Sequence, residues 1–147
     1  MKRAIIVGIA AVLLALTLLS LAGFLELKYT QNGAFVRDWA TKGAPDSRVY
    51  GDPIEFMFRW VRFNQFVISP AVSVVVGLFI GFLCRGRLLL LVIIGVLPIV
   101  VVTYSSDLLS VVSGALCFGF GWLAARSSQV LTSRRTRAQI TSESGNC

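Results

Sequence analysis

Four long apolar blocks, separated by polar segments, dominate the sequence. None of the four contains Asp, Glu, Lys or Arg, and together they cover residues 4–25, 66–84, 88–104 and 108–125. The first block is long enough to cross a hydrocarbon layer of about 30 Å, because each residue adds roughly 1.5 Å along the helix, and the other three are near the lower limit for a span. The pattern therefore predicts an all-α integral membrane protein with four transmembrane helices.

The links between the last three blocks are very short, at residues 85–87 and 105–107. Links of this length place consecutive helices antiparallel and next to one another. We therefore expect an up-down bundle within one membrane domain, residues 1–125. The first block exceeds the apolar core of a cleavable signal peptide, which is at most about 15 residues, so we interpret it as a retained span.

One long segment, residues 26–65, connects the first two spans, and we expect it to form an outer loop with short interfacial helices. Its first helix is predicted at residues 33–43, since Asn32 and Gly43 are residues that favour the two ends of a helix. Trp39 lies in this helix and is expected either to anchor the loop in the membrane interface or to dock a partner.

A second loop helix is predicted to begin after Asp52, a good capping residue, with Pro53 at its first position. Aromatic residues dominate its surface, and its charged side chains share one narrow stripe. Two interpretations remain open: the helix lies on the outer leaflet as an aromatic anchor that leads into the second span, or it docks a partner protein. The residues concerned are Phe56, Arg59, Trp60, Arg62 and Phe63.

Small residues recur on one face of the second span and on one face of the fourth. Such faces allow helix backbones to approach closely, which stabilises helix association in lipid. Two interpretations are again open, because the faces either pack against each other within the chain or contact another subunit. The residues are Ser69, Ser73, Gly77 and Gly81 in the second span, and Ser110, Ser113, Gly114 and Gly121 in the fourth.

Composition and charge agree with a membrane protein and predict its orientation. Hydrophobic residues make up 56% of the chain and charged residues 14%, and the mean hydropathy is +0.79. In the four-span arrangement one side carries eight cations and one acid, whereas the other side carries six of each. By the positive-inside rule both termini are expected in the cytoplasm. Topology thus explains the net charge of +7, and nucleic acid is not an expected partner.

The expected location is a plasma membrane, and we favour a bacterial inner membrane. Residues 126–147 are polar and basic and contain too few apolar residues to form a core. We expect them to be a disordered cytoplasmic tail whose arginines lie near the anionic inner leaflet.

Several kinds of chemistry lack the residues that they need. The chain contains no histidine, and its three cysteines form no CxxC pair, so we expect no metal site, no cofactor and no catalytic residue. The four apolar blocks also lack the buried charge that ion-coupled carriers require.

These absences and the packing faces predict a non-catalytic accessory or assembly subunit of a larger membrane protein complex. The alternative is a small oligomeric transporter or channel without an intramembrane charged coupling residue. The expected partners are the lipid bilayer and other membrane protein subunits, or further copies of the chain.

Overall fold

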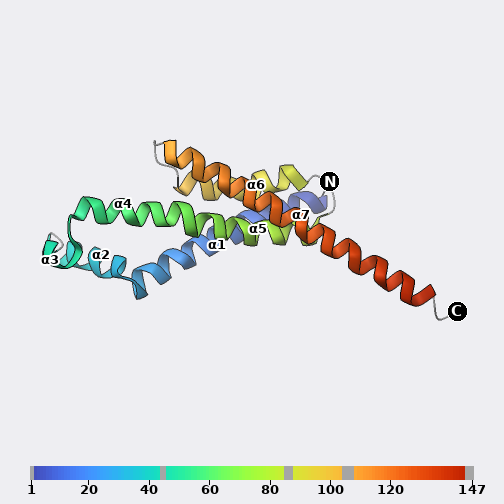
Figure 1. Ribbon diagram of the computed structural model, residues 1–147, viewed down its shortest axis with the longest axis horizontal. Coiled ribbons are helices and arrows are strands. Elements are labelled where there is room, and N and C mark those ends of the chain that lie inside the picture. The colour runs from blue at the N-terminus through green and yellow to red at the C-terminus, as the bar shows by residue number, and fades with distance from the viewer. Residues whose placement is uncertain (1, 44–45, 85–87, 104–107, 145–147) are drawn as a thin grey trace.

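All the described elements are helices, as Figure 1 shows for the computed structural model. The structure describes residues 2–43, 46–84, 88–103 and 108–144. The predicted all-α class is confirmed for these ranges. The two short links between the last three apolar blocks lie outside the described residues.

Within the described residues, three helical stretches are long and apolar enough to cross a membrane: Ala4–Tyr29, Pro53–Leu83 and Leu108–Ser133. The first lies in α1 (Lys2–Tyr29) and the third in α7 (Leu108–Ser144). The remaining apolar helix is α6 (Leu88–Thr103), which has only 16 residues. These long apolar helices support the assignment of the chain as a membrane protein.

The second stretch, Pro53–Leu83, joins three elements, and we expected the first and the last of them to be separate. They are α4 (Pro53–Phe63), the π-helical segment η1 (Asn64–Ile68) and α5 (Ser69–Leu83). We expected α4 to be a distinct interfacial helix and the second span to begin at residue 66. Figure 1 instead shows α4 continuing along the line of α5.

Pro70 gives a physical reason for the π-helical segment. Proline lacks an N–H group, and its ring collides with the carbonyl group four residues earlier in a regular α-helix. The wider turn of η1 ends at Ile68, two residues before Pro70, and the Ser69 N–H donates to the Asn64 carbonyl, five residues back. The helix therefore passes through Pro70 without ending there.

The C-terminal segment is helical where we expected disorder. Helix α7 continues to Ser144, through most of the segment that we interpreted as a tail. Neither glycine nor proline occurs between Gly121 and Ser144. Residues such as Ala, Leu, Arg and Gln favour helix, so the polar composition did not interrupt it.

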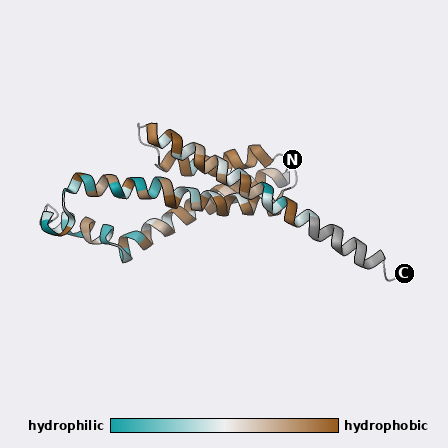
Figure 2. Cartoon of the chain, in the orientation of Figure 1, coloured by the Kyte–Doolittle hydropathy of each residue, from teal (hydrophilic) through white to brown (hydrophobic). Residues whose placement is uncertain are grey.

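Three helices, α2 (Gln31–Lys42), α3 (Ser47–Tyr50) and α4, form a unit that we call the headpiece. It extends from one end of the bundle in Figure 1. The predicted caps at Gly43, with φ of 74°, and Asp52 are confirmed, whereas the first cap is Thr30 and not Asn32. Among the coloured residues of Figure 2, polar positions gather in the headpiece and the bundle is predominantly hydrophobic.

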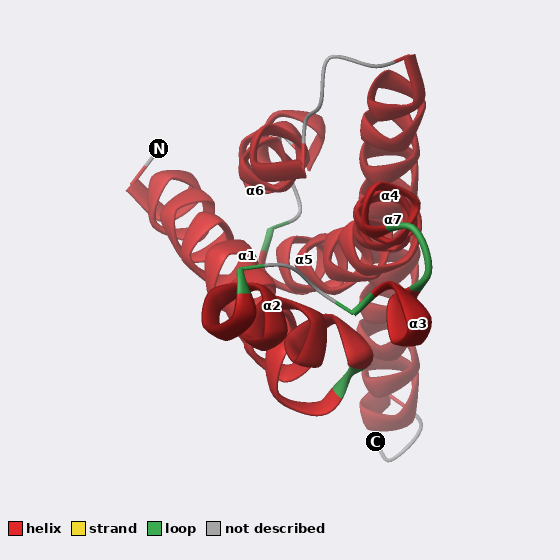
Figure 3. Cartoon of the chain, turned by 90° about the vertical axis from the view of Figure 1, so that its left-hand side faces the viewer, coloured by secondary structure: helices red, strands yellow, loops and turns green. Residues whose placement is uncertain are grey.

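Helices α1, α5, α6 and α7 form the bundle, and Figure 3 shows it from the side of the headpiece. Its core is made of small and β-branched side chains, and α5 and α7 share the most extensive contact. Ala11, Val76, Ile80, Val96 and Ile99 are fully buried. The outward surface is also apolar, as lipid-facing surfaces are.

Candidate functional site

A buried acid joins the headpiece to the bundle. Helix α1 continues past Leu25, where we expected the first span to end, and therefore includes Glu26. This residue is only 8% exposed. Its Oε2 atom accepts a 2.9 Å hydrogen bond from Trp60 Nε1 and a 3.1 Å hydrogen bond from Asn64 Nδ2. We call these three residues the Glu26 cluster.

The location of Glu26 corrects part of the sequence interpretation. We had assigned it to the outer loop and concluded that no span contains an ionisable residue. In the structure the apolar helical stretch Ala4–Tyr29 contains it. One of its oxygens, Oε1, is buried and has no hydrogen-bond partner among the described residues.

Aromatic rings form the interior of the headpiece. Phe35 on α2 is 2% exposed, and its ring stacks on Phe56 with centroids 4.6 Å apart. Tyr50 and Trp39 meet the same Phe35 ring edge to face, at 5.3 Å and 5.6 Å. Rings in these orientations add attraction to the burial of apolar area.

A hydrogen bond of Tyr50 links α3 to α2. The phenol donates to Asp38 Oδ2 at 3.2 Å, and Lys42 pairs with the other oxygen of Asp38, also at 3.2 Å. Burial, and then the neighbouring Asp38 carboxylate, raise the pKa of the Tyr50 phenol above its ordinary value. The neutral phenol is therefore favoured in the folded headpiece.

The two small-residue faces meet inside one chain, where they form a surface that we call the α5–α7 seam. A Cβ atom on Gly77 would overlap the Gly121 carbonyl, and one on Gly81 would overlap the Ala125 carbonyl. Ser69 and Ser73 are fully buried. Gly114 faces α6, because a Cβ atom there would lie 3.3 Å from Val100.

Polar side chains join α7 to η1 at one end of the seam. Gln65 is 3% exposed, and its Nε2 donates to Ser110 Oγ at 3.0 Å. The hydroxyl of Ser113 donates to the backbone carbonyl of Gln65 at 2.5 Å. Ser69 donates to the Asn64 carbonyl at 2.9 Å, so the backbone of η1 accepts hydrogen bonds from side chains.

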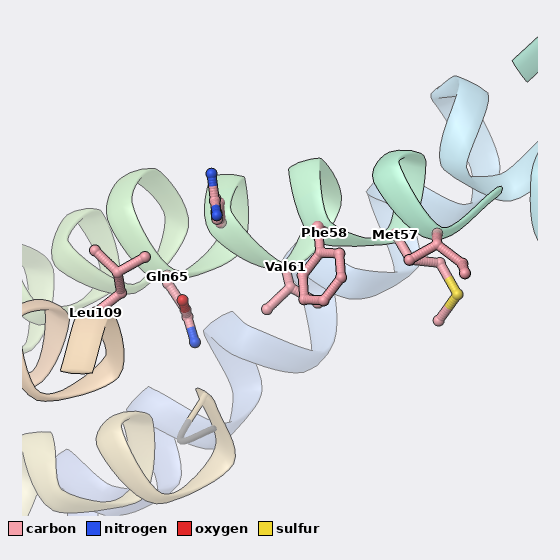
Figure 4. A pocket seen from close by; sticks show the side chains of 7 residues that line it. Met57, Phe58, Val61, Gln65 and Leu109 are labelled. Carbon is pink, nitrogen blue, oxygen red and sulfur yellow. The ribbon is translucent and has the colours of Figure 1, made fainter. Parts of the chain in front are cut away.

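A groove of about 340 Å³ follows the outward side of α4. Figure 4 shows Met57, Phe58 and Val61 along this helix, with Gln65 and Leu109 at one end of the groove. The side chains that line it are mainly apolar: Ile54, Met57, Phe58, Val61, Arg62, Gln65 and Leu109. We call this surface the α4 groove.

The predicted anchor or docking residues of α4 do not share one surface. Phe56 packs into the headpiece and Trp60 binds Glu26. Arg59 lies 3.9 Å from Glu55 in an exposed ion pair. Arg62 lines the α4 groove, and Phe63 is 48% exposed.

Clusters of metal-ligating side chains are absent from the part of the chain that the structure describes. That part contains no group of three or more Cys, Asp or Glu side chains placed to hold a metal ion. Cys84 and Cys117 are buried and form no disulfide. The arrangement supports packing and hydrogen bonding.

Sequence reasoning missed Glu26, Asn64 and Gln65. One signal was available for Glu26, because it lies about 20° around a regular helix from Ala15, on the buried side of α1. Ala15 itself is fully buried. The partners of Glu26 come from residues 34 and 38 positions later, which no local pattern indicates.

Comparison with known proteins adds no relationship to these observations. The sequence matches no protein-family model, and no curated protein and no solved structure is significantly similar to it.

Proposed function

We propose that this chain is a non-catalytic accessory or assembly subunit of a larger membrane protein complex. The observation that carries the proposal is the α4 groove. Its apolar side chains remain exposed after the chain has folded: Ile54 by 65%, Phe58 by 54%, Met57 by 44% and Val61 by 43%. A contiguous apolar surface of this kind is typical of a site for another protein.

The rest of the headpiece supports a docking role for this groove. The α5–α7 seam is already filled within the chain, so its small residues are not available to a partner. Arg62 borders the groove, and arginine beside large apolar side chains is common where proteins bind each other. The helix Pro53–Leu83 has 31 residues and is about 46 Å long, which exceeds a hydrocarbon layer of about 30 Å.

The proposal includes a four-span topology with both termini in the cytoplasm of a plasma membrane, the inner membrane if the cell is bacterial. Support for a fourth span comes from the apolar composition of α6, whose 16 residues extend about 24 Å. A helix of this length crosses if the bilayer thins around it. Leu89 and Val101 on α6 are 60% and 66% exposed, which suits contact with lipid.

Reporter fusions test the topology. A fluorescent protein that folds only in the cytoplasm is expected to be active when it follows residue 86 or residue 144. Alkaline phosphatase, which is active only outside, is expected to be active when it follows residue 44 or residue 106. A fusion at residue 106 with cytoplasmic activity would contradict a fourth span.

The alternative function is a small oligomeric transporter or channel. It would use the hydroxyl groups of Ser69, Ser73, Ser110 and Ser113 to line a path. All four are at most 4% exposed, and Ser69, Ser73 and Ser113 donate hydrogen bonds to backbone carbonyls within the chain. This favours a packing role for them, so the accessory function is the better supported.

Purification in mild detergent tests the accessory role. The full chain is expected to co-elute with one different membrane protein at a fixed ratio. Phe58→Ala combined with Val61→Ala is expected to lower recovery of that protein at least tenfold. The matched control is Phe63→Ala with Val67→Ala, since Phe63 and Val67 are similarly exposed, at 48% and 49%, but lie outside the groove. Recovery of a homo-oligomer alone would instead favour transport.

A further inference from the structure

A second pocket, of about 330 Å³, lies where α7 separates from the end of α5. Gly81 and Phe82 line it from α5, and the segment between Arg126 and Ser133 lines it from α7. A Cβ atom on Gly81 would overlap the Ala125 carbonyl, so the two helices touch beside the pocket. Figure 1 shows α7 continuing beyond this end of the bundle. We call this cavity the Arg126 pocket.

Hydrogen-bond donors line the α7 side of the Arg126 pocket. Arg126, Gln129 and Ser133 lie three and seven positions apart, so they share one face of the helix. The Gln129 amide donates to the Cys84 carbonyl at 2.7 Å, which ties α7 to the residue that ends α5. A side-chain amide has two N–H donors and a guanidinium has five. The pocket therefore offers several donors to one ligand.

Positive charge dominates this end of α7. Arg126 is exposed, and its guanidinium lies 5.2 Å from the centre of the Trp122 ring. The described lining of the pocket contains no acid, and the ion pairs within the described ranges belong to the headpiece. Residues 126–144 contain four arginines and one acid, Glu143. An anion is therefore the ligand that this pocket favours.

The depth of the pocket in the bilayer indicates which anion it meets. Residues 108–125 contain no charged side chain, and a helix of this length extends about 27 Å, close to the hydrocarbon thickness of about 30 Å. Arg126 is thus placed where the hydrocarbon gives way to lipid headgroups. Trp122, one turn earlier, is of a type enriched at that boundary. Phe82, which is 56% exposed, borders the pocket with apolar surface that suits an acyl chain.

We propose that the Arg126 pocket binds the phosphate headgroup of an anionic phospholipid. Basic pockets between transmembrane helices are suited to such headgroups. Arg126 supplies the charge and the planar pair of donors that match phosphate oxygens, and Gln129 adds an N–H donor beside it. The α4 groove lies near Leu109 at the other end of α7, so lipid binding here does not depend on a partner there.

Quenching of Trp122 by brominated lipids tests this inference in the full chain. The sequence contains three tryptophans, and Trp39→Phe with Trp60→Phe leaves Trp122 alone. The protein is placed in phosphatidylcholine bilayers with a minor fraction of brominated lipid, either phosphatidylglycerol or phosphatidylcholine. The anionic brominated lipid is expected to be enriched about fivefold at Trp122 over the zwitterionic one, as one arginine near a headgroup predicts.

Three variants locate the source of this preference. Arg126→Gln removes the charge, and Ser133→Phe fills the pocket at constant charge, so both are expected to abolish the preference. The matched control is Ser127→Phe, which is expected to retain it. Ser127 and Ser133 are both exposed serines of α7 whose hydroxyls donate to carbonyls of the same helix, at 2.8 Å and 2.9 Å, but Ser127 does not line the pocket. Each protein is its own reference, because two lipids are compared in it.

Four results would overturn the proposal. Equal quenching by the two brominated lipids in the Trp122-only protein would mean that no anionic lipid is selected. A preference that survives Arg126→Gln, or equal effects of Ser133→Phe and Ser127→Phe, would mean that the basic helix attracts lipid without this pocket. Soluble glycerophosphate is expected to leave the preference unchanged, and its loss on addition would assign the pocket to a free phosphate. Circular dichroism establishes that each variant keeps its helices.

Discussion

The Trp60 indole donates a 2.9 Å hydrogen bond to Oε2 of Glu26, across 34 positions of the chain. This contact holds α4 against the end of α1 and thereby sets the position of the headpiece. The acceptor is a buried carboxyl group, so the bond is expected to contribute more than an exposed one.

Trp60→Phe removes this hydrogen bond and keeps most of the apolar volume. It is expected to lower the free energy of unfolding by about 1–3 kcal/mol, because the acid loses one of its two donors. Denaturant unfolding in detergent, followed by circular dichroism, measures the change. Trp39→Phe is the control, since the Trp39 ring is 45% exposed. Equal effects of the two variants would contradict a special role for the Trp60 indole.

Gly77→Ala is expected to disrupt the α5–α7 seam. The added methyl group would overlap the Gly121 carbonyl, and backbone atoms cannot move aside as a flexible side chain can. Overpacking of this kind destabilises proteins by about 1–3 kcal/mol. Thermal unfolding in detergent measures the loss. Gly119→Ala should be tolerated, because no atom outside its own stretch of helix lies within 4 Å of a Cβ atom at that position. An unaffected Gly77→Ala protein would refute the close approach.

Much of the helical pattern could be predicted from the sequence, and the reasons are local. The absence of charge over residues 88–104 and 108–125 predicted α6 and the first part of α7. Asp52 and Gly43 act as predicted because capping depends on the residue and its immediate neighbours. The small residues at four-residue intervals indicated close helix packing, although the sequence did not specify its partner.

Features that depend on distant or competing interactions were not predicted. An aromatic helix with one charged stripe suits a separate interfacial helix as well as it suits the outer part of a longer helix, so the continuity of α4 with α5 was missed. The burial of Glu26 depends on Trp60 and Asn64. The helicity of residues 126–144 was missed because polar composition was given more weight than the lack of glycine and proline.

Gln65 and Ser110 are expected to be energetically coupled. Their side chains form a 3.0 Å hydrogen bond that joins η1 to α7. In a double-mutant cycle with Gln65→Met and Ser110→Ala, the interaction energy is expected to be about 0.6 kcal/mol, the average for hydrogen bonds between membrane helices. Unfolding of the four proteins in the cycle measures it. Additive effects would mean that the bond contributes nothing to stability.

The headpiece is expected to loosen in alkali through Tyr50. The pKa of this phenol is raised in the folded protein above its ordinary value of 10.0, so folding favours the neutral form. The associated stabilisation is complete below about pH 10 and is lost as the pH rises through the raised pKa. Phenolate absorbance measures the titration, and Tyr50→Phe identifies the step that belongs to Tyr50. Asp38→Asn should move that step to lower pH, and an unmoved step would contradict the assignment.

Photo-cross-linking from the α4 groove tests the accessory role most directly. A photoreactive phenylalanine analogue at position 58 places the reactive group in the groove, and the same analogue at position 63 places it outside. Irradiation of intact membranes is expected to join position 58, and not position 63, to one different membrane protein. Cross-links only to lipid or to a second copy of the chain, or equal cross-linking from both positions, would contradict the account.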